Sequence, residues 1–269
     1  MTHPYLSLEH PIRLAHRGSR VLWPENTMTA FQGAVDLGYR YIETDVRLTL
    51  DGVVVVFHDE TLERVTNGAG RVSEWRYEEL RRLDAAYRYG ESDGFPHRDT
   101  GVTVPTLEEV LTTWPDVHFN IDLKARRMQW HVAEVIQKLG RHDSTLIGAF
   151  SDMRVARYRH ILGGRAATSA GPVRAVVMYA ASRFGAPLRS KAVAYQLPFD
   201  ARLAPIDRRL VAAAHSSGAQ VHAWTVNEAA DMHRLLGLGV DGIVTDRPDV
   251  LNEVVEARTS SLGGSEDLG

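Results

Sequence analysis

Residues 41–59 read YIETDVRLTLDGVVVVFHD, and the expected fold follows from this stretch. The run Tyr41–Leu48 predicts a central strand. Because side chains alternate along a strand, Glu43 and Asp45 lie on one face of it. The Asp51-Gly52 pair is typical of a tight turn, and the apolar run after it predicts a second strand folded back as a β-hairpin.

Short apolar runs alternate with amphipathic segments along the rest of the chain. Segments such as NTMTAFQGAVDLG (26–38) and WHVAEVIQKLG (130–140) have helical periodicity and end in glycine, which often follows a helix C-terminus. Repeated alternation of strand and helix predicts a parallel sheet, and 269 residues suit a TIM (β/α)₈ barrel of typically ~250 residues. The predicted strands are Ile12–His16, Tyr41–Leu48, Val53–His58, His118–Leu123, Leu146–Phe150, Ala166–Ala170, Ala192–Leu197, Gln220–Val226 and Gly242–Thr245.

The domain organisation is expected to be simple. Residues 1–257 form one α/β barrel domain, with a small hairpin-containing insertion after the second strand at approximately 51–105. The small, polar residues 258–269 are expected to form a flexible tail. The sequence has no internal repeat and no second domain.

Composition excludes several classes of function. The chain has no cysteine, which removes disulfides, thiolate metal ligands and thiol nucleophiles and suits a reducing compartment. A formal net charge of -3 argues against a general nucleic-acid binder. No stretch reaches the ~20 apolar residues of a membrane span, so we expect a soluble, cytoplasmic protein.

The first predicted strand ends in His16-Arg17-Gly18. Catalytic residues of barrels cluster at the carboxyl ends of the strands, so this histidine and arginine lie where catalytic residues are expected. An arginine fork suits phosphate oxygens, and a histidine moves protons near neutral pH. A plain basic pair at the start of a surface loop is the alternative.

Two predicted strands bring acidic side chains inward. Glu43 and Asp45 repel each other and lose solvation unless a cation compensates, and a hard divalent cation such as Mg²⁺ or Ca²⁺ would do so. In FNIDLK (119–124), Asp122 and Lys124 share a face at a strand end. Asp122 is a candidate third metal ligand, and Lys124 is a candidate to hold phosphate or to balance the carboxylates.

Other polar residues follow strands or precede helices. The hairpin would return His58 toward Glu43 and Asp45 as a second proton-transfer candidate, with Asp59 to orient it or cap the loop. Trp224 is either an apolar wall for the organic part of a substrate or a core aromatic. Asn26 is expected to cap a helix, and Asp246 to begin a loop and cap another.

Six segments together resemble the glycerophosphodiester phosphodiesterase family. They occur in order from the first strand to the last, and nearly cover the barrel. The resemblance implies a TIM barrel with a hairpin insertion after the second strand, and hydrolysis of small-molecule glycerophosphodiesters to glycerol 3-phosphate and an alcohol. The segments are LAHRGSRVLWPENTMTAF (14–31), GYRYIETDVRLTLDGVVVVFHDETLERVTNGAG (38–70), VPTLEEVL (104–111), FNIDLK (119–124), VHAWTVN (221–227) and GVDGIVTDRPD (239–249).

The resemblance also implies roles for individual residues. One departure affects the metal: the family more often has Glu where this chain has Asp122, which puts the choice among Mg²⁺, Ca²⁺ and Mn²⁺ in question. The implied roles are metal binding for Glu43, Asp45 and Asp122, general acid–base catalysis for His16 and His58, and phosphate binding for Arg17 and Lys124.

Two alternatives stay open, as does a homo-oligomeric state. One is a non-catalytic barrel that only binds phosphodiesters. The other is a lysophospholipase D, in which the same site cleaves an acyl-bearing phosphodiester beside an apolar channel. The aromatic residues considered for that channel, which could equally pack the insertion onto the barrel, are Trp23, Trp75, Tyr87, Tyr89 and Phe95.

Overall fold

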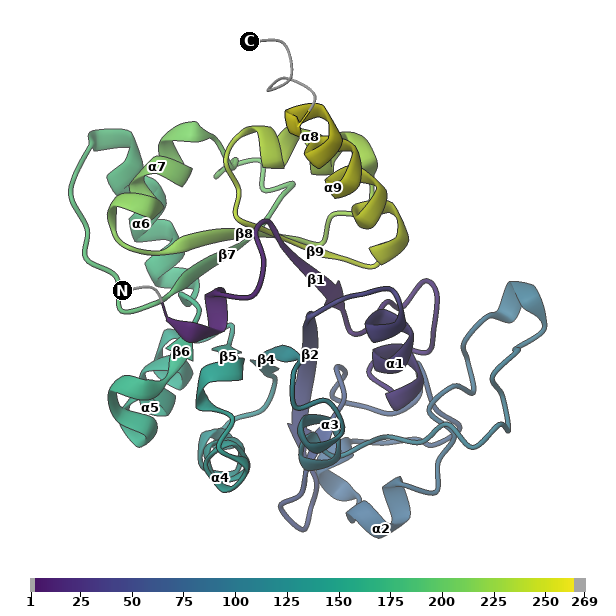
Figure 1. Cartoon of the computed structure of the whole chain (residues 1–269). Helices are drawn as coiled ribbons and strands as arrows, with labels where there is room; N and C mark the ends of the chain where they lie inside the picture. The colour runs from purple at the N-terminus through teal and green to yellow at the C-terminus, as the bar shows by residue number, and fades with distance from the viewer. Residues whose placement is uncertain (1–2, 264–269) are drawn as a thin grey trace.

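Eight parallel strands form a barrel in the computed structural model, which describes residues 3–263 (Figure 1). Seven neighbouring pairs are hydrogen-bonded in the order β6-β5-β4-β2-β1-β9-β8-β7. A single parallel bridge between Ser169 and Ala194 joins the two ends, so the barrel is nearly closed. The strands are β1 (Ile12–His16), β2 (Tyr41–Leu48), β4 (His118–Leu123), β5 (Thr145–Gly148), β6 (Ala167–Thr168), β7 (Ala194–Pro198), β8 (Gln220–Trp224) and β9 (Gly242–Thr245).

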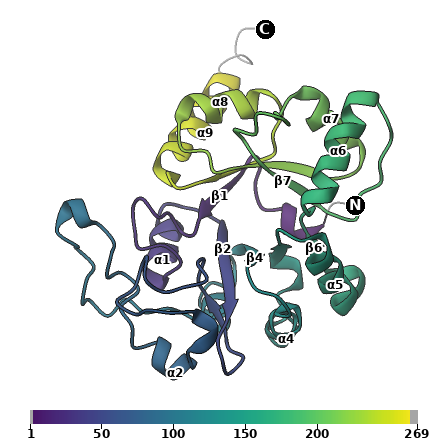
Figure 2. The ribbon, with the colours of Figure 1, turned by 180° about the vertical axis from the view of Figure 1, so that it is seen from behind.

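Helices between the strands cover the outside of the barrel, which confirms the predicted TIM architecture (Figures 1 and 2). Side-chain oxygens begin several of these helices: Thr106 accepts a hydrogen bond from the Glu109 amide, and Asp207 accepts one from the Leu210 amide. The helices are α1 (Met28–Asp36), α2 (Tyr77–Leu80), α3 (Leu107–Thr113), α4 (Gln129–Leu139), α5 (Asp152–Leu162), α6 (Pro172–Phe184), α7 (Arg208–Ser216), α8 (Ala229–Gly237) and α9 (Pro248–Gly263).

The hairpin predicted after β2 is present. Strand β3 (Val54–Val56) pairs antiparallel with β2, with Val46 opposite Val56. Gly52 has a φ of +82° in the connecting turn, a conformation that glycine adopts without steric cost. The strand is shorter than predicted, although the Phe57 amide just beyond it still bonds to the Asp45 carbonyl on β2.

The segment between β3 and α3 packs around a small apolar cluster of its own that includes Leu62 and Leu80. It contains α2 and two short 3₁₀ helices, η2 (Val72–Glu74) and η3 (Glu91–Asp93). The Tyr89 hydroxyl donates a hydrogen bond to the Val21 carbonyl, which ties the segment to the loop after β1. Both views place the segment on the side of the barrel opposite α6 (Figures 1 and 2).

Four of the nine predicted strands, β1, β2, β4 and β9, have the predicted bounds, and the other five differ by at most two residues at either end. Helix α9 continues to Gly263, past residue 258 where the sequence analysis begins a tail, and residues 264–269 lie outside the described part of the chain. Within residues 3–263, no helix combines the length and the apolar character needed to cross a bilayer.

Candidate active site

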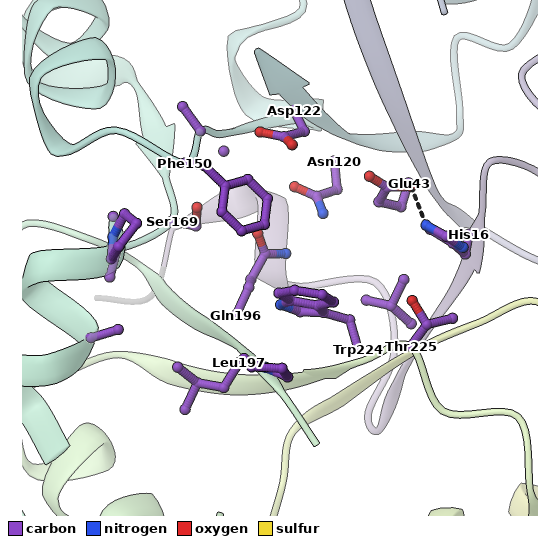
Figure 3. A pocket seen from close by; sticks show the side chains of 18 of the residues that line it. His16, Glu43, Asn120, Asp122, Phe150, Ser169, Gln196, Leu197, Trp224 and Thr225 are labelled. Atoms are coloured by element: carbon purple, nitrogen blue, oxygen red, sulfur yellow. Dashed lines mark ion pairs between the residues drawn. The ribbon is translucent and has the colours of Figure 1, made fainter. Parts of the chain in front are cut away.

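A cavity of about 580 Å³ opens at the carboxyl ends of the barrel strands (Figure 3). Strands β1, β2, β4, β7 and β8 contribute to it, as the barrel architecture predicts for a site at this end. All eight site residues expected from the sequence line this cavity: His16, Arg17, Glu43, Asp45, His58, Asp122, Lys124 and Trp224.

The pairing of β2 with β4 places the acidic residues of the two strands at neighbouring positions. Glu43 is in register with Asn120, and Asp45 is in register with Asp122. Asn120 therefore belongs to the same oxygen-rich face, although the sequence analysis did not select it. Its position two residues before Asp122 on one strand was the signal that could have found it.

Asp45 is almost fully enclosed, with an exposed fraction of 1%. Its oxygens lie 2.9 Å from Lys124 Nζ and 3.0 Å from Arg17 Nε, and Asn26 donates a hydrogen bond of 3.0 Å. Burial alone would raise the pKa of the Asp45 carboxyl, but the two cations outweigh burial and lower this pKa to about 2. Asp45 is therefore a carboxylate at all ordinary pH values.

Glu43 is also buried, but it has fewer positive charges close to its carboxylate than Asp45 has. Its carboxylate lies 3.8 Å from His16 Nε2 and accepts a 3.3 Å hydrogen bond from the Arg17 amide. Burial, followed by the neighbouring Asp45 charge, raises the pKa of the Glu43 carboxyl well above its usual range. An additional positive charge would favour the ionised form of Glu43.

Whether the pocket suits a metal ion depends on its unsatisfied oxygens. Among the described residues, no three carboxylates or histidines converge into a ready metal site, and Lys124 Nζ lies between Asp45 and Asp122 at 2.9 and 2.6 Å. Asp122 Oδ1 and Asn120 Oδ1, however, are buried without a hydrogen-bond partner. Unpartnered hard oxygens beside Glu43 fit a divalent cation that prefers oxygen ligands.

Each of the two histidines is held by a carboxylate. His16 Nδ1 lies 2.7 Å from Asp246 Oδ1, and His58 Nδ1 lies 2.5 Å from Asp59 Oδ1. An Nδ1–H that donates to a carboxylate leaves Nε2 available for proton transfer. Burial lowers the pKa of His58, although the Asp45 charge opposes this effect. The pocket therefore contains two oriented imidazoles.

Asp246 begins the loop after β9, as the sequence analysis expected, but its side chain bonds to His16 in the site, a role that the sequence analysis did not assign. It follows β9 directly, its side chain is fully buried, and besides His16 it accepts hydrogen bonds from Arg20 and Asn227. Burial would raise the pKa of this carboxyl, but His16 and Arg20 outweigh burial and lower the pKa to about 2. Its place at the carboxyl end of a barrel strand was the available signal.

The loop after β1 contains several residues with positive φ, among them Arg17 with φ +54° and Asn26 with φ +56°. Arg17 Nη1 lies 2.9 Å from Glu25 Oε1, so Glu25 holds this arginine in place. Asn26 does not cap α1, because Thr27 is the cap residue and accepts a hydrogen bond from the Ala30 amide. The Asn26 side chain instead donates a hydrogen bond to the Asp45 carboxylate.

The far wall of the pocket is apolar. The rings of Phe150 and Trp224 meet edge to face at 5.8 Å, Leu197 lies on the same side (Figure 3), and Val176 also lines the pocket. Trp224 therefore forms part of an apolar wall. None of the insertion aromatics considered for an apolar channel, nor Trp23, lines the cavity. One polar group interrupts this wall: Gln196 Nε2 is buried without a partner.

Comparisons with known proteins agree on one family. The family model for the glycerophosphoryl diester phosphodiesterase family matches residues 16–250. A "Probable glycerophosphodiester phosphodiesterase 2" of Mycobacterium tuberculosis is 39% identical over 92% of this chain and 91% of that protein. A glycerophosphodiester phosphodiesterase of Caldanaerobacter subterraneus subsp. tengcongensis is 32% identical over 90% and 96%. The crystal structure of a glycerophosphodiester phosphodiesterase from Agrobacterium tumefaciens has a TM-score of 0.72 and 25% identity, covering 93% of this chain and 99% of that chain.

Asp246→Asn tests the pairing with His16. We expect kcat for phosphodiester hydrolysis to fall about 10–100-fold, the range for losing a group that orients an active-site ligand, with KM and metal affinity nearly unchanged. Steady-state kinetics and calorimetric metal titration measure these quantities. The control is Asp249→Asn, which removes an exposed ion pair with Arg247. Equal kcat values for the two variants would contradict a positioning role for Asp246.

Proposed function

The chain belongs to the glycerophosphoryl diester phosphodiesterase family and is an enzyme of that class, and we propose that it hydrolyses glycerophosphodiesters with a divalent metal ion and two histidines. Membership removes the alternative of a barrel that only binds phosphodiesters. The observation that carries the proposal is the convergence of two histidine–carboxylate pairs, His16–Asp246 and His58–Asp59, on one oxygen-rich pocket.

The metal would be held by Glu43, Asp45 and Asp122, with Asn120 as a further oxygen donor. Their oxygen chemistry favours Mg²⁺ or Ca²⁺, with Mn²⁺ as a further candidate. When bound, such an ion neutralises charge that develops on phosphoryl oxygens. The unpartnered oxygens of Asp122 and Asn120 support this assignment.

Two cationic side chains are available for the phosphate. Arg17 and Lys124 lie at the same end of the pocket as the carboxylates, and each is buried enough to interact strongly with an anion. We assign both to the phosphoryl oxygens. Lys124 then has two duties: it balances Asp45 and Asp122 in the free enzyme and binds phosphate when substrate is present.

The two histidines divide the proton transfers. Hydrolysis adds one water across a P–O bond, so one proton leaves the attacking oxygen and another reaches the departing alcohol oxygen. One imidazole accepts the first proton and the other donates the second. Asp246 and Asp59 hold His16 and His58 in orientation for these transfers and stabilise the imidazolium forms.

The pocket suits the substrate in shape as well as charge. The polar half, on β1, β2 and β4, fits the phosphoglycerol part, and the Gln196 amide is placed to donate to a hydroxyl group. The half that contains Phe150 and Trp224 would contact the alcohol part. A cytoplasmic location and a homo-oligomeric state remain predictions.

The first test is release of glycerol 3-phosphate from glycerophosphocholine by the purified protein. We expect turnover that EDTA abolishes and that one or more of Mg²⁺, Ca²⁺ and Mn²⁺ restores, because the buried carboxylates need a cation. Coupled enzymatic detection of glycerol 3-phosphate measures the rate. Full activity in EDTA, after metal analysis confirms removal, would contradict the metal assignment.

Glu43→Ala and Asp45→Ala test the metal ligands. We expect each to abolish measurable turnover and to weaken metal binding, since each removes an oxygen donor from the same face of β2. Isothermal titration with the activating metal gives the affinity. Glu60→Ala is the control, because Glu60 is exposed and pairs only with Arg71 among the recorded ion pairs. A variant of Glu43 or Asp45 with the control's turnover would remove that residue from the metal site.

His16→Ala and His58→Ala test the acid–base pair. We expect kcat to fall about 10²–10⁴-fold, the usual contribution of one general acid or base, while the metal stays bound. Stopped-time product assays and metal titration separate the two effects. His160→Ala, on the exposed side of α5, is the matched control. If either variant matched the control in kcat, that histidine would lose its catalytic role.

A lysophospholipase D activity is the second candidate, and the apolar wall favours it. Phe150, Val176 and Trp224 could contact an acyl chain attached to the phosphodiester. The assay above, repeated with detergent-dispersed lysophosphatidylcholine, distinguishes the two substrates by kcat/KM. A higher kcat/KM for the lysolipid, with release of free choline, would make the acyl-bearing substrate the preferred one.

A further inference from the structure

Helix α6 has apolar side chains on the face it turns to solvent. Val173 and Val176 have exposed fractions of 65% and 67%, and Phe184 at the end of the helix reaches 87%. Positions 173, 176, 177, 180 and 184 follow helical spacing, so these side chains form one stripe. The opposite face packs Met178 and Ala181 into the fold. A continuous exposed apolar stripe marks a surface that contacts something else.

The stripe is continuous with the pocket mouth. Val176 belongs to both the stripe and the pocket lining. Phe150 lines the pocket and is largely exposed, and Leu203, with an exposed fraction of 94%, lies between two residues of the pocket lining, Ala201 and Ala204. We call this set the apolar rim, and it consists of Phe150, Val173, Val176, Val177, Phe184 and Leu203.

The apolar rim lies in the most basic part of the sequence. Residues 150–210 contain eleven Lys and Arg but only three Asp, whereas the whole chain has a formal net charge of -3. Residues 172–191, which include α6, contain four basic residues and no acidic one. Of these four, Arg174, Arg189 and Lys191 are exposed. An anionic partner therefore matches this surface.

We propose that the apolar rim and its flanking cations dock the enzyme onto an anionic lipid bilayer. Apolar side chains would enter the boundary between headgroups and acyl chains, and Arg174, Arg189 and Lys191 would face the anionic headgroups. Because Val176 also lines the pocket, docking brings the pocket mouth to the lipid surface. The insertion lies on the other side of the barrel (Figures 1 and 2).

Charge disfavours a second copy of the chain as the occupant. A two-fold symmetric dimer places the same patch of each subunit against itself. The cations of α6 and of the following loop would then face their own copies, with no acidic residue in 172–191 to compensate. A bilayer rich in anionic lipid provides both the apolar layer and the opposite charge.

The test is co-sedimentation of the full chain with vesicles of phosphatidylcholine alone or mixed with phosphatidylglycerol, without substrate. We expect binding to the mixed vesicles that weakens as NaCl increases, because salt screens the headgroup charge. Val177→Ser/Phe184→Ser should reduce the partition coefficient roughly 10-fold or more, as apolar contacts are lost. Arg189→Glu/Lys191→Glu should reduce it by a similar factor at low salt.

Two controls make the result specific. Leu50→Ser/Trp130→Ser removes two largely exposed apolar side chains outside the rim and should bind like the unaltered chain. Turnover of soluble glycerophosphocholine should be equal in all these variants, so a failure of the proposed hydrolysis appears there and not in vesicle binding. Equal vesicle binding by Val177→Ser/Phe184→Ser and the unaltered chain would overturn the proposal. A dimer that this variant converts to a monomer, with no vesicle binding, would assign the rim to a second copy.

Discussion

A single buried charge organises the end of the barrel. The Asp45 carboxylate is almost fully enclosed, and a charge in that position is stable only with opposite charges and hydrogen-bond donors around it. Arg17, Lys124 and Asn26 supply them from the loop after β1, from the end of β4 and from the turn before α1. Arg17 and Asn26 adopt left-handed backbone conformations, and in these conformations both side chains reach the Asp45 carboxylate.

Much of this arrangement is encoded locally, which is why the sequence predicts it. Strands β1, β2, β4 and β9 are short segments in which apolar residues alternate with polar ones or adjoin them, and their bounds match the predicted ones. Period-two alternation places Glu43 with Asp45, and Asp122 with Lys124, without knowledge of any partner strand. The Asp51-Gly52 turn then determines the hairpin that returns His58 to the site.

The features that the sequence analysis missed depend on contacts between distant segments. Asp246 and His16 are 230 residues apart, and only the closure of the barrel makes β1 and β9 neighbours. Asn120 becomes part of the site through its register with Glu43. Of the apolar wall, the sequence analysis named only Trp224, and it sought an apolar channel among Trp23 and the aromatic residues of the insertion. The wall is assembled from the loop after β5, from strands β7 and β8 and from α6. No local pattern identifies such a set.

The pocket is therefore divided between two halves of the barrel. The half built from β1, β2 and β4 concentrates carboxylates, cations and imidazoles that can act on a phosphodiester, whereas the half built from β5 to β8 offers apolar contacts. The same division continues outside the pocket, where the second half carries exposed Val173 and Phe184 within a basic stretch of an otherwise acidic chain. Overall net charge conceals this asymmetry, because the excess of acid elsewhere cancels a basic surface placed beside the pocket mouth.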